Sequence, residues 1–547
     1  MASPITRRRF LQSSAAVGAA AAVCGPAGIA SANGGTAMPG PTPDPFPWSE
    51  APIADLQAAM ESGETTARRI TLDHLERIEQ LDWAGPRVNS VIEVNPDAEA
   101  VAGALDQERA DRHVRGPLHG IPVLLKDAIA TDDRMQITAG SLALVGSRVP
   151  RDAGLVTKLR DAGAVLLGKA NMSEWNAFRG WPLHGGWSAR AGTSRNPYDL
   201  SRSTGDSSSG SAAAVAASFA AGAVGLETYG SIVMPSSLCG VVGLKPTHGL
   251  VSRSGTIGIA HSRDVLGPIG RTVADVATML SAIAGQDPLD PFTVGSVGHV
   301  RADYRRFLDP AGLRGARIGV WRPKHLWKHD EVAAVIEEAI AALREAGARV
   351  IDPVALPHWL DATGEHVSVM FSEFRHDIGA YLSGLTDTSM RTLADVIAFN
   401  EAHHHEELRW HSQGLLESAN EQPPLSDPGY RRSLRRSRRL GRAAFDRPMT
   451  EHRLDAIVAP TFIRAWVIDL RGGDDPLNGN GAAGPSNAAG YPHITVPSGF
   501  ARGLPIGMSF MARAWEEPKL LRYAHAFEQA TQVRRAPRFT ELPFVDR

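Results

Sequence analysis

Short apolar runs that alternate with helical segments are the feature that most constrains the fold of this chain. Residues 123–125 and 164–168 are apolar runs of strand length, and residues 155–162 between them are spaced like a helix that ends at Gly163. The alternation returns in the second half, where residues 330–346 place apolar side chains on one helical face. Further strands are predicted at residues 318–320, 350–351, 455–459 and 494–496, and further helices at 211–221 and 520–530. This order predicts an α/β sheet covered by helices.

The composition is that of a folded globular protein. The chain has 547 residues, of which 43% are hydrophobic and 21% charged, and both values are near globular averages. They exclude a wholly disordered chain, a collagen and a coiled coil. The net charge of −2 gives no reason to expect a nucleic acid or a membrane as partner. Only seven of the 57 cations are lysines, so each lysine is worth examining for a specific role.

The N-terminus is predicted to be an export signal. Residues 6–11 (TRRRFL) form a twin-arginine pattern, an Ala- and Val-rich stretch follows to Val23, and residues 30–32 (ASA) fit the small-residue cleavage rule. Residues 1–32 also contain no acidic side chain. We therefore expect cleavage of residues 1–32, transit through the twin-arginine translocon, and a periplasmic or secreted protein.

Two other interpretations of the N-terminus are less well supported. An uncleaved membrane anchor would span poorly, because two glycines and a proline interrupt the apolar run. A lipoprotein attached at Cys24 would need a small residue before it, where this chain has Val23. Once residues 1–32 are removed, Cys239 is the remaining cysteine, which excludes an internal disulfide and a cysteine-based zinc site.

The chain beyond the signal divides into a tether and one domain. Residues 33–48 contain five prolines and several glycines and are typical of an extended tether. No repeat or domain break follows, so residues 49–547 are expected to form one domain.

Two Ser/Gly segments are the strongest chemical signals. Residues 205–211 (GDSSSGS) lead into an Ala-rich helix, and a second turn carries Ser231, 24 residues after Ser207. A phosphate cradle is one interpretation of such a loop, but the Lys-Ser/Thr pair of a P-loop is missing. The intervening helix could instead return the chain so that the two serines meet.

A serine nucleophile needs a base, and Lys126 is a candidate. It follows the apolar run 122–125, where burial would lower its pKa and allow a neutral amine to accept a proton. The alternative is an ordinary solvated surface cation.

Four motifs follow one another along the chain: residues 116–127 (GPLHGIPVLLKD), 205–211, 231–247 (ending in GLKPT) and 489–492 (AGYP). Together they resemble the amidase signature family, and residues 225–233 (GLETYGSIV) look most like its bacterial peptide amidase branch. The likeness covers about residues 50–535. It implies one large domain whose mixed, twisted β-sheet is sandwiched between α-helices, and an amidase that cleaves carboxamide C–N bonds, with peptide amides as the closest substrate class.

The resemblance also assigns roles. It implies a Ser–cis-Ser–Lys triad with Ser231 as nucleophile, Ser207 as the bridging serine and Lys126 as base, acting through an acyl-enzyme. The backbone N–H groups of Thr228, Tyr229, Gly230 and Ser231 would form the oxyanion hole. The family requires neither a metal nor a cofactor, so the expected partner is an amide substrate.

Three departures from the family pattern bear on catalysis. Tyr229 stands where the common turn has Gly, and its side chain is expected to shape the pocket. Val233 removes an Arg that many members carry, as in peptide amidases. Asp206 stands where Gly precedes the bridging serine, at the peptide bond that the family makes cis. We expect the Asp206 charge to raise the pKa of Lys126 and to give an alkaline optimum.

Other interpretations stay open. An amidase for acylated amines or aryl amides fits the same motifs, and so does a non-catalytic binding protein that kept the fold. The acyl group is not identified, although residues 288–450 resemble the family least and are where specificity is expected. His403, His404 and His405 and the arginine-rich run 431–439 are predicted to lie on solvated helix faces, and Cys239 is predicted to be buried.

Overall fold

The structure of the protein is a computed structural model that describes residues 46–474 and 481–541. The predicted signal peptide, residues 1–32, and residues 33–45 of the predicted tether lie outside this range. No helix within the described residues has both the length and the apolar character that a membrane crossing requires.

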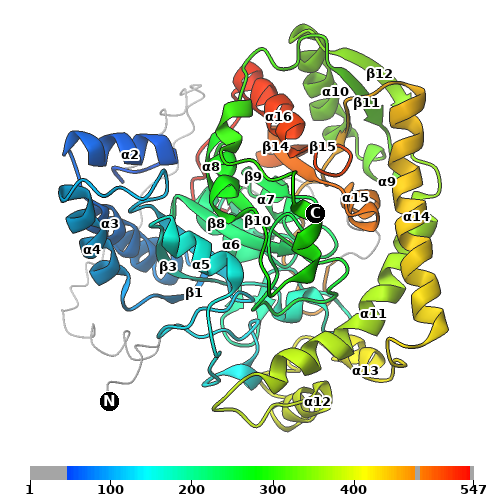
Figure 1. The fold of residues 1–547 in the computed structure, drawn as a ribbon. Helices are drawn as coiled ribbons and strands as arrows, with labels where there is room; N and C mark the ends of the chain where they lie inside the picture. Colours follow the sequence, from blue (N-terminus) through cyan, green and yellow to red (C-terminus); the bar gives the residue numbers. More distant parts are fainter. Residues whose placement is uncertain (1–45, 475–480, 542–547) are drawn as a thin grey trace, which may run out of the picture.

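An 11-stranded mixed sheet runs through the centre of the molecule (Figure 1). Strand β2 pairs in parallel with β3 and β8, whereas the remaining neighbours are mainly antiparallel. This confirms the predicted α/β fold with a mixed sheet. In spatial order the strands are β1 (Val91–Val94), β3 (Val165–Ala170), β2 (Pro122–Lys126), β8 (Gly222–Glu227), β10 (Val265–Gly270), β9 (Val242–Lys245), β14 (His493–Ala501), β15 (Leu504–Met511), β13 (Ala456–Pro460), β11 (Arg317–Trp321) and β12 (Arg349–Val354).

Helices cover both faces of the sheet, and two glycines of β8 show which helix lies on which face. A Cβ atom on Gly222 would lie 2.4 Å from Met279 Sδ, and one on Gly225 would lie 2.8 Å from Ser208 Oγ. Residues three apart in a strand point to opposite faces. The first face carries α8 (Val273–Ile283), α16 (Glu517–Thr531) and α10 (Asp330–Glu345), and the second carries α6 (Ser209–Ala216) and α7 (Val233–Leu238).

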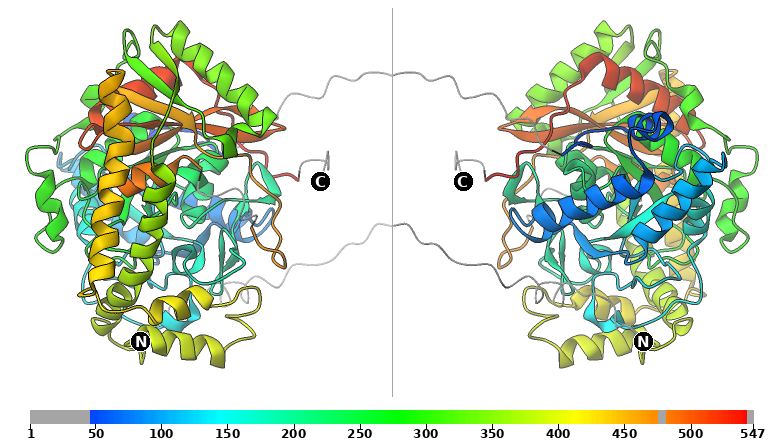
Figure 2. Two further views of the ribbon diagram at one scale, coloured as in Figure 1. Left: turned by 90° about the vertical axis from the view of Figure 1, so that its right-hand side faces the viewer. Right: turned by 90° about the vertical axis from the view of Figure 1, so that its left-hand side faces the viewer.

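The remaining helices flank this core (Figures 1 and 2). Four of them belong to the N-terminal part of the described chain: α2 (Ile53–Ser62), α3 (Ala67–Arg77), α4 (Ala98–Ala110) and α5 (Gly154–Asp161). On the other side, α11 (Trp359–Ser383) packs against α14 (Pro428–Glu451) and α15 (Ala483–Ala489), and nearby lie α9 (Lys324–Trp327), α12 (Leu393–Ala402) and α13 (Gly414–Asn420). Two small ribbons complete the fold: β4 (Trp187–Ser188) with β5 (Gly192–Thr193), and β6 (Arg195–Asn196) with β7 (Asp199–Ser203).

The residues predicted to play no chemical role are placed as expected. The arginine-rich run 431–439 lies on α14, and all of its arginines but Arg438 are exposed or nearly so. His403, His404 and His405 are exposed, although they follow the end of α12 instead of lying within a helix. Cys239 is buried.

Candidate active site

Lys126 lies at the carboxyl end of β2 and is fully buried. Its Nζ donates hydrogen bonds to Ser207 Oγ at 2.7 Å and to the carbonyl oxygen of Leu226 at 3.2 Å. Strands β2 and β8 are parallel neighbours, so their carboxyl ends meet at one edge of the sheet. This topology brings Lys126 beside the turn that follows β8 and excludes the surface-cation alternative.

The two serine-bearing loops are joined at the same edge. Ser208 donates its backbone N–H to the carbonyl oxygen of Ser231 at 3.2 Å, and its hydroxyl donates to the Leu226 carbonyl at 3.1 Å. The loop turns at Gly205, whose φ of +91° lies in the left-handed region that favours glycine. The structure thus joins the Ser207 loop to the Ser231 turn through their backbones.

The Ser231 turn is held in place by hydrogen bonds to the side chain of Glu227. This buried carboxylate accepts the backbone N–H groups of Ile232 at 2.8 Å and Val233 at 3.0 Å, where α7 begins. Gly230, just before the serine, has a φ of +98°. Ser231 itself is 4% exposed, and its hydroxyl hydrogen-bonds to the Asp206 carboxylate. No role for Glu227 is assigned from the sequence alone; in the structure its carboxylate fixes the direction of the turn.

The peptide bond before Ser207 corrects one expectation. The family resemblance implied a cis bond between Asp206 and Ser207. In the described residues the cis bonds are Trp181–Pro182 and Asp352–Pro353, so the Asp206–Ser207 bond is trans. A cis bond before a residue other than proline costs about 3–4 kcal/mol, and Ser207 Oγ reaches Lys126 with the trans bond.

Burial dominates the protonation of Lys126. Desolvation lowers the pKa of Lys126 to about 7, against the opposing charges of Asp206, Asp264 and Glu227. Asp206 keeps some exposed surface, but the protein packed around its carboxyl group raises its pKa, against the charge of Lys126. Both pKa shifts favour the uncharged forms, a neutral Lys126 amine and a protonated Asp206 carboxyl group. The expectation that the Asp206 charge would outweigh burial is therefore wrong, and a neutral amine is accessible near neutral pH.

An Asp206→Asn substitution is expected to move the acidic limb of the kcat/KM–pH profile to lower pH. Asparagine keeps the shape of the side chain but removes the carboxylate that raises the pKa of Lys126. Activity that needs neutral Lys126 would then begin at a lower pH. The profile of both proteins on one amide measures the shift, and Asp206→Gly should move the limb in the same direction. A limb that stays in place in both variants would contradict the coupling.

Thr228, at the start of the turn, is held by a residue that the sequence did not single out. The Thr228 hydroxyl donates a hydrogen bond to Asp264 Oδ1 at 2.5 Å. The Thr228 carbonyl oxygen accepts a hydrogen bond from Nε2 of His366 at 3.1 Å. Asp264 also accepts the backbone N–H groups of Ile259 and Ala260, and burial raises its pKa to about 7. Asp264 follows the turn by 36 residues, so only the folded chain reveals the contact.

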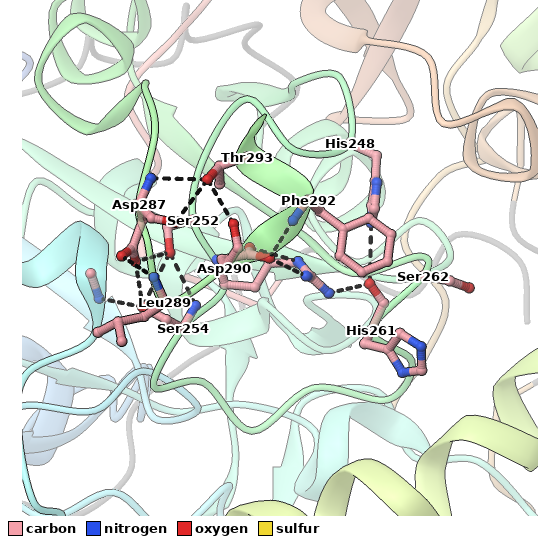
Figure 3. A network of polar contacts seen from close by, with 12 residues as sticks. His248, Ser252, Ser254, His261, Ser262, Asp287, Leu289, Asp290, Phe292 and Thr293 are labelled. Carbon is pink, nitrogen blue, oxygen red and sulfur yellow. Dashed lines mark hydrogen bonds and ion pairs between the residues drawn. The ribbon is translucent and has the colours of Figure 1, made fainter. Parts of the chain in front are cut away.

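The loop that presents Asp264 is fixed by a polar network (Figure 3). Arg253 Nε donates to Asp290 Oδ2 at 3.0 Å, and the guanidinium also donates to the carbonyl oxygen of His261. Ser252 and Ser254 both donate their hydroxyls to Asp287. The Asp264 side chain that binds Thr228 therefore comes from a loop that several hydrogen bonds hold in place.

The predicted export signal, which lies outside the described residues, is supported by a comparison with family models. Residues 4–23 match the family model of the TAT (twin-arginine translocation) pathway signal sequence. The protein carries a twin-arginine signal and is exported by that route.

We expect the exported protein to begin at or near Asn33, because residues 30–32 form the small-residue cleavage site. N-terminal sequencing of exported material tests this. A start at Met1 or Cys24 would contradict cleavage at Ala32.

Comparison with known proteins identifies the family. Residues 69–521 match the family model described as Amidase. The chain is 48% identical to native peptide amidase from Stenotrophomonas maltophilia, over 90% of this chain and 100% of that chain, with a TM-score of 0.86. It is 38% identical to a protein of Arabidopsis thaliana named "Probable amidase", over 90% and 92% of the two chains. An amidase family protein from Bacillus anthracis str. Ames is 33% identical, with a TM-score of 0.81 and coverage of 89% and 92%. The chain therefore belongs to the amidase signature family of hydrolases.

Proposed function

We propose that the protein hydrolyses carboxamides through an acyl-enzyme on Ser231, with C-terminal peptide amides as the substrate class. The observation that carries the proposal is the buried contact of 2.7 Å between Lys126 Nζ and Ser207 Oγ, in a loop bonded to the Ser231 turn. The similarity to peptide amidase supports peptide amides over other amides.

The first half of the reaction acylates the serine. Neutral Lys126 accepts the proton of Ser207, and Ser207 accepts that of Ser231 as Ser231 Oγ attacks the amide carbon. The carbonyl π bond opens to an oxyanion. The proton then returns along the same relay to the amide nitrogen, the C–N bond breaks, and ammonia leaves an ester on Ser231.

The oxyanion is proposed to bind the backbone N–H groups of Thr228, Tyr229, Gly230 and Ser231. Those of Thr228, Gly230 and Ser231 donate to no acceptor within the described part of the chain. One such donor contributes about 3–4 kcal/mol to the transition state where it has been measured. In the second half, water attacks the ester and gives up a proton to the relay, which releases the carboxylic acid and restores Ser231. No step in this scheme requires a metal or a cofactor.

Two other functions from the sequence argument are tested by the same experiment. An amidase for acylated amines or aryl amides would use the same relay with a different leaving amine. A non-catalytic binding protein would keep the fold without turnover, and the contact between Lys126 and Ser207 counts against it.

The test combines turnover with labelling. The mature protein is assayed for release of ammonia or amine from peptide amides, fatty amides and anilides. A fluorophosphonate probe is then mapped by mass spectrometry. We expect ammonia release from peptide amides and an adduct on Ser231. Release from anilides alone would favour the aryl amide alternative, and no release with no adduct would favour the binding protein.

A further inference from the structure

A cavity of about 700 Å³ opens beside the Ser231 turn. It lies between the ends of β11 and β12, helix α9, the first turns of α11 and Gly481. We call it the Trp359 pocket and define it by Tyr229, Trp321, Lys324, Leu356, Trp359 and Leu360. A volume of this size is typical of a small-molecule site and exceeds what one side chain needs.

Tyr229 connects this pocket to the proposed active site. Its backbone lies two residues before Ser231, and its side chain lines the pocket. The Tyr229 ring rests beside α15, because a Cβ on Gly484 would lie 3.3 Å from its Oη. Its hydroxyl hydrogen-bonds to Thr363 of α11. Two residues of backbone span at most about 7 Å, so one or two residues of a bound acyl chain would reach the pocket.

The walls of the pocket are apolar and aromatic. Trp321 and Trp359 pack edge to face with ring centroids 5.4 Å apart, and His325 lies 5.5 Å from the Trp359 ring. Burial lowers the pKa of His325, which keeps its imidazole neutral. Leu360, which also lines the pocket, is 66% exposed and adds an apolar surface that a ligand can cover. These walls suit a large apolar side chain.

The rim of the pocket carries an unmatched positive charge. Arg322 is held by Asp352, with two contacts of 2.6 Å, and by Glu337. Lys324 is exposed and forms no ion pair with any described residue. No Asp or Glu lines the pocket within the described residues, so Lys324 favours an anion at the entrance.

We infer that the Trp359 pocket binds the acyl part of the substrate and selects amides with a large apolar residue at the scissile end and a carboxylate one residue further out. Acetyl-Glu-Phe-amide is the simplest peptide amide with both features. This inference rests on the proposed function, because it needs the acyl chain to start at Ser231. It adds a preference that the relay alone does not explain.

The test compares kcat/KM for acetyl-Phe-amide, acetyl-Ala-amide, acetyl-Glu-Phe-amide and acetyl-Gln-Phe-amide. We expect Phe to exceed Ala by at least about tenfold, because each methylene group that enters an apolar pocket is worth roughly a factor of ten or more. Glu should exceed Gln by about threefold at low salt, the size typical of an exposed ion pair. That ratio should fall toward one as salt is added.

Matched variants assign each preference to a residue. Lys324→Gln should remove the Glu:Gln preference, whereas Lys328→Gln should retain it, since Lys328 is an exposed lysine four residues away that does not line the pocket. Trp359→Ala should reduce the Phe:Ala ratio several-fold, and Trp359→Phe should restore most of it. Thermal unfolding of each variant confirms that the ratios refer to folded protein.

The outcomes distinguish a failure of the proposed pocket preference from a failure of the proposed amidase function. If wild type releases ammonia but both ratios are near one, or if Lys324→Gln leaves the Glu:Gln ratio unchanged, the pocket inference is overturned. If wild type hydrolyses none of the four amides, the proposed function itself fails on peptide amides.

Discussion

Replacement of Ser231 by alanine is expected to lower kcat by roughly a millionfold, the loss seen when a serine hydrolase loses its nucleophile. The hydroxyl is the atom that would carry the acyl group, and a bound water would not reproduce its position. The substitution removes one oxygen from a side chain that is 4% exposed and breaks one hydrogen bond, to Asp206. The fold should therefore persist. Ammonia release, fluorophosphonate labelling and thermal unfolding measure these three expectations.

Ser209→Ala is the matched control for this substitution. Ser209 begins α6 directly after the Ser207 loop and is buried, and its Oγ has no hydrogen-bond partner among the described residues. Loss of this hydroxyl should leave both kcat and labelling close to wild type. A Ser231→Ala protein that still turns over substrate and still takes up the probe would mean that another residue is the nucleophile.

The sequence predicted elements with an uninterrupted apolar pattern better than elements that glycine interrupts. The predicted helix at 330–346 is α10 (Asp330–Glu345), and the predicted strand at 123–125 is the core of β2 (Pro122–Lys126). The helix has a clear helical period of apolar residues, and the strand is a continuous apolar run. Strand β8 (Gly222–Glu227) was not predicted, because Gly222 and Gly225 interrupt its apolar run.

Those glycines have a physical reason that only the fold reveals. A Cβ on Gly225 would lie 2.8 Å from Ser208 Oγ, so the glycine lets the serine loop lie against the sheet. Residues that are weak for strand prediction thus allow the approach that the site needs. Two glycines in a short apolar run, next to a Ser/Gly turn, are a signal that could have marked the strand.

The electrostatics of the site could not be predicted from the sequence either. The motif placed Asp206 next to the relay, but the balance between its charge and burial depends on how completely Lys126 is enclosed. Lys126 is 0% exposed, which makes desolvation the larger effect. The Asp264 contact with Thr228 is likewise long-range, and no local pattern indicates it.

Replacement of Lys126 by methionine is expected to lower kcat/KM by about 10²–10⁴, the usual contribution of a general base. Methionine fills most of the same buried volume but cannot accept a proton. Because burial lowers the pKa of Lys126 to about 7, wild-type kcat/KM should rise as the pH passes through neutrality and the amine loses its proton. The residual activity of the variant should lack this limb.

Thermal unfolding distinguishes the loss of a base in Lys126→Met from a loss of the folded structure. Lys126 is a buried group whose charge is costly, so the methionine variant should unfold at the same temperature as wild type or higher. Lys169→Met is the matched control. Lys169 is also fully buried, lies on the neighbouring strand β3, and donates to the carbonyl of Ile129 instead of a serine. Its loss should keep the pH limb. If Lys126→Met retains near-normal kcat/KM, or both variants lose the limb alike, the lysine-based relay is incorrect.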